Sequence, residues 1–381
     1  MATAQVPTKS AFPFLDLKAQ FSSIREEVTE SVTRVLESQH FILGPEVSAF
    51  ENEVGRFLDS KFSIGCASGS DALLLGLMAL GIAPGDEVIT TPFTFVASAG
   101  SIARIGAVPV FVDIDPNIYN LDPNQLEDAV TAKTKAIMPV HLFGLPAEMD
   151  PIMEVANRRK IPVIEDAAQA IGSEYRNRKV GTIGVIGCFS FFPSKNLGGA
   201  GDGGLITTND PVIAAHIRLL RVHGARNKYE YEALGINSRL DAMQAAILRV
   251  KMRYLESWTN DRRRNAGRYR SLVADHGLED RIRLPREPEH CRHVFNQFTV
   301  QVEARDHLRQ HLQENGIPSE IYYPYPLHLQ RAFKNLGYKP GSMPHSEKVS
   351  AQVLSLPIFS EMTAGQQEMV ISAVASFFAK N

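Results

Sequence analysis

Hydrophobic residues near the start of the chain recur with the spacing of an α-helix. Between residues 17 and 37 they follow one another at intervals of three and four, at Phe21, Ile24, Val28, Val32 and Val35. This spacing predicts an amphipathic helix with one buried face, and the Gly44-Pro45 pair ends the region. A second helix is predicted directly afterwards, with a buried face formed by Val47, Phe50, Val54 and Phe57.

Short β-branched runs alternate with helical stretches from about residue 61 onward. The predicted strands cover residues 62–66, 87–90, 109–114, 136–140, 162–164, 188–192 and 205–208. Further helices are predicted to begin near residues 72, 211 and 240. This alternation is typical of an α/β fold with a mostly parallel sheet, in which ligands bind beyond the carboxyl ends of the strands.

The length of the chain indicates more than one core. A chain of 381 residues exceeds what one ordinary hydrophobic core supports. The helical stretch that ends near Trp258 is interpreted as a bridge to a smaller unit. We therefore predict a large domain over residues 14–258, which carries the sheet, and a small C-terminal α+β domain over residues 259–381.

Composition excludes several classes of function. Hydrophobic residues make up 44% of the chain and charged residues 22%, and the net charge of −2 favours neither nucleic acid nor an anionic membrane. Residues 1–13 lack the apolar core of a signal peptide, and the longest apolar run, 72–83, is too short to span a bilayer. We predict a cytoplasmic protein that binds small molecules and a second copy of itself.

Neither the cysteines nor the histidines predict a metal site. The three cysteines, Cys66, Cys188 and Cys291, are far apart and form no CxxC pair, which also argues against a disulfide framework. Widely spread histidines are structural by default; these are His141, His223, His293 and His328. The arginine run at 262–264 lies in a predicted helix and is typical of a solvated face.

The strongest chemical signal is Lys195, which lies between the aromatic residues 189–192 and the glycine-rich residues 198–204. Partial desolvation lowers the pKa of a lysine, and an uncharged amine can condense with a carbonyl group. The alternative is an ordinary surface lysine in a loop. Residues 199–204 also match GxGxxG, but a predicted strand follows them where a dinucleotide fingerprint requires a helix. The glycines more plausibly let the backbone pass close to a cofactor.

Three further signals surround this lysine in the predicted fold. Residues 68–71 follow a strand and open a helix, which is the arrangement of a phosphate seat; the alternative is simple N-capping by Ser70 or Asp71. Glu165 and Asp166 lie at a strand end; alternation sends them to opposite faces, so one can enter a site while either could be a cap. Phe93 and Phe95 follow another strand and could stack on a flat ring or pack in the core.

These parts together are those that hold pyridoxal phosphate. Five motifs, in this order, resemble the nucleotide-sugar aminotransferases of the DegT/StrS family: GSDAL at 69–73, EDAAQ at 165–169, SFFPSK at 190–195, NSRLD at 237–241 and YPYP at 323–326. The resemblance runs from about Phe14 to Phe378. It implies fold type I of the pyridoxal phosphate enzymes, arranged as a homodimer with shared active sites.

The resemblance also implies roles for individual residues around the cofactor ring. Lys195 corresponds to the residue that bonds the cofactor and moves a proton between the Cα of the amino donor and the C4′ carbon. Asp166 pairs with the protonated pyridine nitrogen, which keeps the ring an electron sink. Gln169 resembles the residue that touches the ring hydroxyl, and Phe95 the one that covers the ring face.

Phosphate and substrate contacts follow from the same resemblance. Ser190, Gly69 and Ser70 are expected at the phosphate, together with Asn237 from the partner subunit. Expected substrate contacts are Arg239, Tyr322, Tyr323 and His328. Many relatives have histidine where this chain has Tyr322, so this contact departs from the family pattern. The alternative role for Arg239 is a salt bridge at the subunit interface.

The implied reaction is transfer of an amino group from an amino acid, glutamate by resemblance, to a keto group at C3 of a nucleotide-linked sugar. Action at C4 is the alternative within the family. A sugar dehydratase is a second alternative, although such relatives carry histidine in place of Lys195. A third is a non-catalytic regulator. Such a protein does not need Asp166, Ser190 and Lys195 in combination, and this chain has all three.

Overall fold

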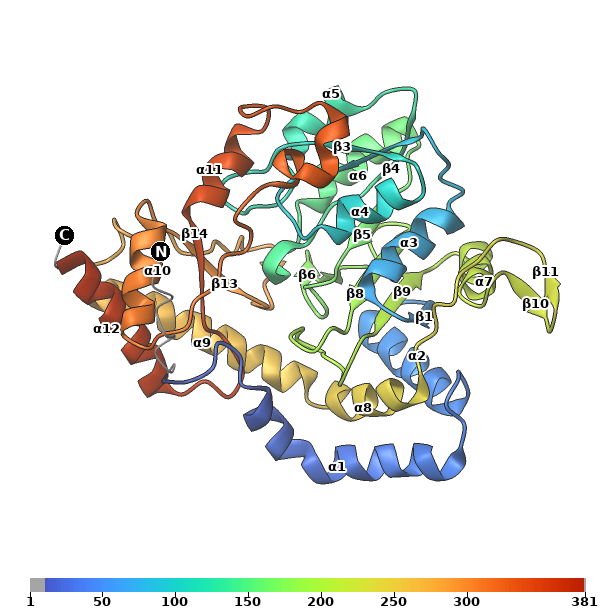
Figure 1. The fold of residues 1–381 in the computed structure, drawn as a ribbon, viewed down its shortest axis with the longest axis horizontal. Coiled ribbons are helices and arrows are strands. Elements are labelled where there is room, and N and C mark those ends of the chain that lie inside the picture. Colours follow the sequence, from blue (N-terminus) through green and yellow to red (C-terminus); the bar gives the residue numbers. More distant parts are fainter. Residues whose placement is uncertain (1–10, 380–381) are drawn as a thin grey trace, which may run out of the picture.

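The computed structural model describes residues 11–379, so most of the 1–13 stretch interpreted above lies outside the described residues. Figure 1 shows a large unit built on a central sheet and a C-terminal unit beside it. The strands of the large unit are β1 (Phe62–Cys66), β2 (Glu87–Thr90), β3 (Val108–Phe111), β4 (Thr134–Ile137), β5 (Ile164–Asp166), β8 (Ile186–Ser190) and β9 (Gly204–Thr208). Its short hairpin strands are β6 (Glu174–Tyr175), β7 (Arg178–Lys179), β10 (Ala225–Asn227) and β11 (Glu230–Tyr231).

The central sheet is mostly parallel, as the alternating pattern predicts. Its strands are ordered β1-β9-β8-β5 and β3-β2-β4, and parallel bridges from Ile137 to Val163 and from Val140 to Asp166 join the two parts. β9 runs antiparallel to both β1 and β8, while β5 and β8 run parallel. The carboxyl ends of β5 and β8 therefore meet at one edge, where Asp166 and Ser190 end their strands.

Helices cover both faces of this sheet because its strand residues alternate between two apolar cores. One core contains Phe189 and Leu205 and packs against α2, α6 and α8. The other contains Cys188 and Ile206 and packs against α3, α4 and α7. The helices of the large unit are α1 (Leu17–Ser38), α2 (Pro45–Leu58), α3 (Gly69–Ala79), α4 (Ala97–Arg104), α5 (Leu126–Ala129), α6 (Met149–Arg159), α7 (Pro211–Leu220) and α8 (Ala242–Met252).

The C-terminal unit has its own apolar core, to which the two-stranded sheet of β13 and β14 contributes. Its elements are α9 (Leu255–Asp275), β12 (Cys291–Arg292), β13 (Phe298–Gln301), α10 (Arg305–Glu314), α11 (Pro344–Gln352), β14 (Val353–Leu356) and α12 (Ala364–Ala379). Because the two units have separate cores, we propose that they are two domains, 14–258 and 259–381, with the division inside α9. Among residues 11–379, no helix has the length and apolar character needed to cross a membrane.

Two local predictions were wrong in detail. Phe21 is 36% exposed instead of lying on the buried face of α1. Arg262 is buried, not solvated, because the helical period turns it inward, where Nη1 donates to the carbonyl oxygens of Ile358 at 2.9 Å and Phe295 at 3.1 Å. Burial lowers the pKa of Arg262 to about 10. The strand ends also shift: the predicted strand at 162–164 is β5, so both acidic residues lie within the strand.

Candidate active site

The start of α3 forms a seat for an anion at the sheet edge. Ser68 caps the helix by accepting the Asp71 N–H at 3.1 Å, so the N-cap is Ser68 and not Ser70 or Asp71, the two candidates from the sequence. The N–H groups of Gly69 and Ser70 precede the first helical bond and face no acceptor within residues 11–379. A Cβ on Gly69 would lie 2.6 Å from the Cβ of Ser190. Ser190 therefore adjoins this seat.

Glu165 and Asp166 have separate environments, as strand alternation requires. Glu165 is fully buried, and its two carboxylate oxygens accept the N–H groups of Ile183 and Gly181, each at 2.7 Å. His141 Nε2 lies 2.9 Å from the same carboxylate. These bonds give Glu165 a structural role that joins β5 to the loop before β8.

Asp166 faces the seat side of the sheet. Its Oδ2 accepts a hydrogen bond from Ser98 Oγ at 2.7 Å, and its Oδ1 accepts the Ala168 N–H at 3.2 Å. Burial raises the pKa of Asp166, whereas the Ser98 bond, the Ala168 bond and the positive charge of Lys195 each lower it. Nothing in the sequence spacing signals Ser98, because it lies 68 residues away from Asp166.

The charges of Lys195 and Asp166 act on each other. Burial lowers its pKa to about 8, and the negative charge of Asp166 opposes that shift. Of the three phenylalanines before Lys195, Phe189 and Phe191 are buried, whereas Phe192 is 54% exposed. The predicted desolvation of Lys195 is confirmed, because burial is the main cause of its lowered pKa.

The lowered pKa predicts that reconstitution with cofactor depends on pH, because Lys195 is the amine proposed to capture the cofactor. At pH 7 roughly a tenth of the Lys195 amines are uncharged, against about one in three thousand for an ordinary lysine. We expect the rate of covalent cofactor capture by cofactor-free protein to rise with pH and to level off above a midpoint near pH 8. Stopped-flow absorbance measures this midpoint, which should move lower in Asp166→Asn because the opposing charge is removed. A midpoint near 10.5 would show that Lys195 is solvated.

The fold also brings Gln169, Tyr323 and Phe95 together. Gln169 Oε1 accepts the Phe143 N–H at 2.7 Å, and its Nε2 donates to the Tyr323 hydroxyl at 3.2 Å. The Phe95 ring lies 6.4 Å from the Tyr323 ring and is 56% exposed. Phe93 is fully buried, so core packing is correct for Phe93 while Phe95 remains available to cover a ligand.

The remaining candidate residues lie in several environments. Asn237 is exposed and Arg239 half-buried, and between them Ser238 Oγ accepts the Ala67 N–H at 3.1 Å, which holds this segment against the end of β1. The half-buried Tyr322 ring lies 5.9 Å from that of Tyr323.

His328 is buried, and its Nε2 lies 3.0 Å from the Glu347 carboxylate. This is the position of a structural histidine.

The chain matches a known protein family over almost all of its length. Residues 22–375 match the DegT/DnrJ/EryC1/StrS aminotransferase family. The chain belongs to this family. The predicted family and the fold type I architecture are therefore confirmed.

Relatives within the DegT family cover nearly the whole chain. A pleiotropic regulatory protein of Geobacillus stearothermophilus is 49% identical over 96% of this chain and 98% of its own. The UDP-N-acetyl-3-dehydro-alpha-D-glucosamine 3-aminotransferase of Acidithiobacillus ferrooxidans is 45% identical over 96% and 97%. The solved structure of DesV from S. venezuelae is 44% identical, with a TM-score of 0.94 over 97% of this chain and 99% of DesV.

The predicted cofactor of this DegT-family chain, pyridoxal phosphate, is confirmed at the level of the family. The structure of NtdA from Bacillus subtilis with bound cofactor PMP has a TM-score of 0.90 at 33% identity, over 98% of this chain and 86% of NtdA. The residues present here fit such a group. Free N–H groups at the start of α3 suit its phosphate, and the buried Asp166 carboxylate suits its pyridinium nitrogen.

The glycine-rich loop after Lys195 depends on residues that the sequence did not single out. Gln244 Oε1 in α8 accepts the Ala200 N–H at 2.8 Å, and Lys251 Nζ donates to the Gly198 carbonyl at 2.7 Å. A Cβ on Gly198 would lie 2.2 Å from the Pro193 carbonyl oxygen. The loop can therefore fold back on itself only with glycine at this position, while α8 holds its outer side.

Proposed function

We propose that this DegT-family aminotransferase moves an amino group from glutamate to the C3 keto group of a nucleotide-linked sugar. The observation that carries the proposal is the pairing of a lysine of lowered pKa, Lys195, with a buried carboxylate, Asp166, beside the phosphate seat. Relatives named as sugar 3-aminotransferases, including those of Acidithiobacillus ferrooxidans and Streptomyces venezuelae, support the position of the acceptor group.

The chemistry divides between the cofactor and the chain. Pyridoxal phosphate, when bound, supplies a ring that withdraws electrons from the donor's Cα. Asp166 holds a proton on the ring nitrogen, and Ser98 helps to keep Asp166 ionised. Lys195 Nζ accepts the proton from the donor's Cα and returns a proton to the acceptor carbon in the second half of the reaction.

Binding contacts complete the proposed site. Gly69 and Ser70 N–H groups and the Ser190 hydroxyl bind the phosphate, while Phe95 covers the ring face and excludes water. Gln169 contacts the ring hydroxyl. Arg239, Tyr322 and Tyr323 are proposed to contact the substrate; a guanidinium suits a diphosphate or a sugar carboxylate. His328 is left out of this set because its buried ring is already paired with Glu347.

An assay of two acceptor classes tests the proposal. We expect purified protein with pyridoxal phosphate and glutamate to aminate C3-keto nucleotide sugars and to leave the C4-keto compounds unchanged, because the relatives above act at C3 by name. Product mass and the formation of 2-oxoglutarate measure the reaction, with reactions lacking glutamate as the control. Turnover of the C4-keto compounds alone would replace C3 with C4 in the proposal.

The Geobacillus relative is named a pleiotropic regulatory protein, so a regulatory function is the second candidate. A regulator that only senses a ligand has no need for a lysine of lowered pKa next to a buried carboxylate. If protein that binds cofactor normally transfers an amino group to none of the keto sugars, that result would favour the second function. A dehydratase is disfavoured because Lys195 occupies the position that is histidine in such relatives.

We further propose a homodimer in which Asn237 reaches the phosphate of the partner subunit. Figure 1 shows the β10–β11 hairpin projecting from the large unit. Large apolar side chains in this hairpin and directly after it are exposed to solvent. Tyr229 is 77% exposed, Tyr231 63% and Leu234 93%. A second copy would cover this surface. A cytoplasmic location without nucleic-acid or membrane partners remains part of the proposal, supported by the net charge of −2.

Mixing of two inactive variants tests the shared site. Asn237→Asp removes a donor and adds like charge beside the phosphate, so cofactor affinity should fall. When this variant exchanges subunits with Lys195→Ala, half of the dimers are hybrid and each has one intact site, so roughly a quarter of wild-type activity should return. The matched control mixes Lys195→Ala with Asp166→Asn: because both residues act in their own chain's site, each of the two sites of a hybrid dimer carries one lesion and no activity returns. No recovery in the first mixture, after verified exchange, would contradict the shared site.

A further inference from the structure

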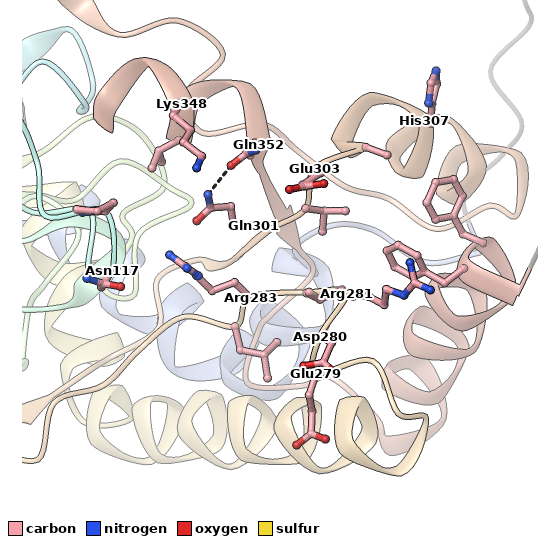
Figure 2. Close-up of a pocket in the computed structure, with 18 of the residues that line it drawn as sticks. Asn117, Glu279, Asp280, Arg281, Arg283, Gln301, Glu303, His307, Lys348 and Gln352 are labelled. Carbon is pink, nitrogen blue, oxygen red and sulfur yellow. Dashed lines mark hydrogen bonds between the residues drawn. The ribbon is translucent and has the colours of Figure 1, made fainter. Parts of the chain in front are cut away.

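A hollow of about 1110 Å³, separate from the proposed active site and called here the second hollow, lies where the C-terminal unit meets a loop of the large unit. None of the residues of the proposed active site lines it. Figure 2 shows Asn117, which follows β3, facing Arg283 and Gln301 of the C-terminal unit, with Lys348 and Gln352 of α11 above them. The walls therefore come from three separate parts of the chain.

Two cations at one end of this hollow lack acidic partners. Within residues 11–379, no carboxylate lies within ion-pair distance of either Arg283 or Lys348, and both residues are exposed. The carboxylates that line the hollow, Glu279, Asp280 and Glu303, are drawn away from this end, toward Arg281 (Figure 2). Unpaired cations in a concave surface concentrate positive potential, so this end attracts an anion.

A buried acceptor beside these cations also lacks a partner. Gln301 Nε2 donates to Gln352 Oε1 at 2.6 Å, but Gln301 Oε1 is buried without any hydrogen bond. An unsatisfied buried acceptor costs folding free energy, and a ligand that brings a donor removes this cost. The phosphate group of a phosphate ester is largely ionised at neutral pH and offers no donor, whereas its sugar or ribose carries hydroxyl groups.

We propose that this end of the hollow binds a phosphorylated sugar or nucleotide. The phosphate group contacts Arg283 and Lys348, and a ligand hydroxyl donates to Gln301 Oε1. The volume is sufficient for a molecule of this size. The site is separate from the transamination site, and the proposal holds or fails independently of the reaction assigned above.

Calorimetric titration of the cofactor-loaded protein tests this site, with glucose 1-phosphate, UMP and inorganic phosphate as probes. We expect the double variant Arg283→Gln with Lys348→Gln to weaken binding of the organic probes by about tenfold or more, because two charge-assisted contacts are lost. Arg281→Gln is the matched control: Arg281 lies over the Phe378 ring at the other end of the same hollow, so affinity should change less than about twofold. Unchanged cofactor absorbance shows that each variant is folded.

Gln301→Leu separates the hydroxyl contact from the phosphate contact. It should weaken binding of glucose 1-phosphate and UMP and leave binding of inorganic phosphate unchanged, and the organic probe that loses more affinity in Gln301→Leu identifies the ligand class. Equal affinity of wild type and the double variant for both organic probes, or no binding of either at millimolar concentration, would overturn the proposal. Equal loss for all three probes in Gln301→Leu would remove the hydroxyl contact from it.

Discussion

Lys195→Ala should lower turnover by several orders of magnitude while the protein still binds cofactor. In the proposed function the lysine supplies both the bond to the cofactor and the amine that moves the proton, and loss of a group that acts chemically costs about 10⁴-fold or more. The phosphate seat and Asp166 are untouched by this change, so non-covalent binding should persist. The prediction therefore separates chemistry from binding.

Borohydride reduction followed by mass spectrometry provides the second measurement on this variant. Wild-type protein should keep one cofactor per chain after denaturation, attached at Lys195, and the variant should keep none. Lys135→Ala, at an exposed lysine of β4, is the control and should behave as wild type. A colourless wild-type protein that cannot be loaded with cofactor, or an active Lys195→Ala, would contradict the assigned role.

Asp166→Asn should reduce turnover by about a thousandfold, since the carboxylate proposed to hold the pyridine proton loses its charge while its shape is kept. The stability of the cofactor-free protein, in contrast, should not fall in this variant. Burial raises the pKa of Asp166 in the folded state, so the cofactor-free protein loses stability as pH rises from the ordinary aspartate pKa through the raised one. Asparagine does not ionise, and cofactor-free Asp166→Asn should melt no lower than wild type at neutral pH.

Glu165→Gln is the matched control for this pair of adjacent acids. Glu165 accepts backbone N–H groups with both oxygens, and an amide NH₂ placed against such donors should cost about 1–3 kcal/mol of unfolding free energy. Its turnover, measured below the melting transition, should stay near that of wild type. The reverse pattern, in which Glu165→Gln abolishes turnover and Asp166→Asn does not, would show that the other carboxylate is the functional one.

Local sequence was sufficient for most secondary elements and for the motifs that identify the family. The helical spacing in residues 17–37 and the alternation that follows depend on neighbours within about four positions, which is why α1, α2 and the mostly parallel sheet could be predicted. The lysine motif at 190–195 is likewise contiguous. Strand ends shifted by a few residues, because pairing with other strands, not composition, decides where a ladder stops.

Contacts between distant segments were decided only by tertiary structure. Alternation showed that Glu165 and Asp166 point to opposite faces, but which face holds Ser98 and Lys195 depends on how α4 and the loop after β8 pack. The same holds for Arg262, whose inward side chain finds carbonyl oxygens about 33 and 96 residues away.

The second hollow is the clearest case of a feature that sequence alone could not reveal. Arg283 and Lys348 belong to different elements, and no spacing or motif links them to each other or to Asn117. Periodicity reports which side of an element is buried, because burial follows from the geometry of that element alone. Which charges are left unpaired, and which acceptor is left without a donor, depends on the packing of whole elements, and only the folded chain determines that.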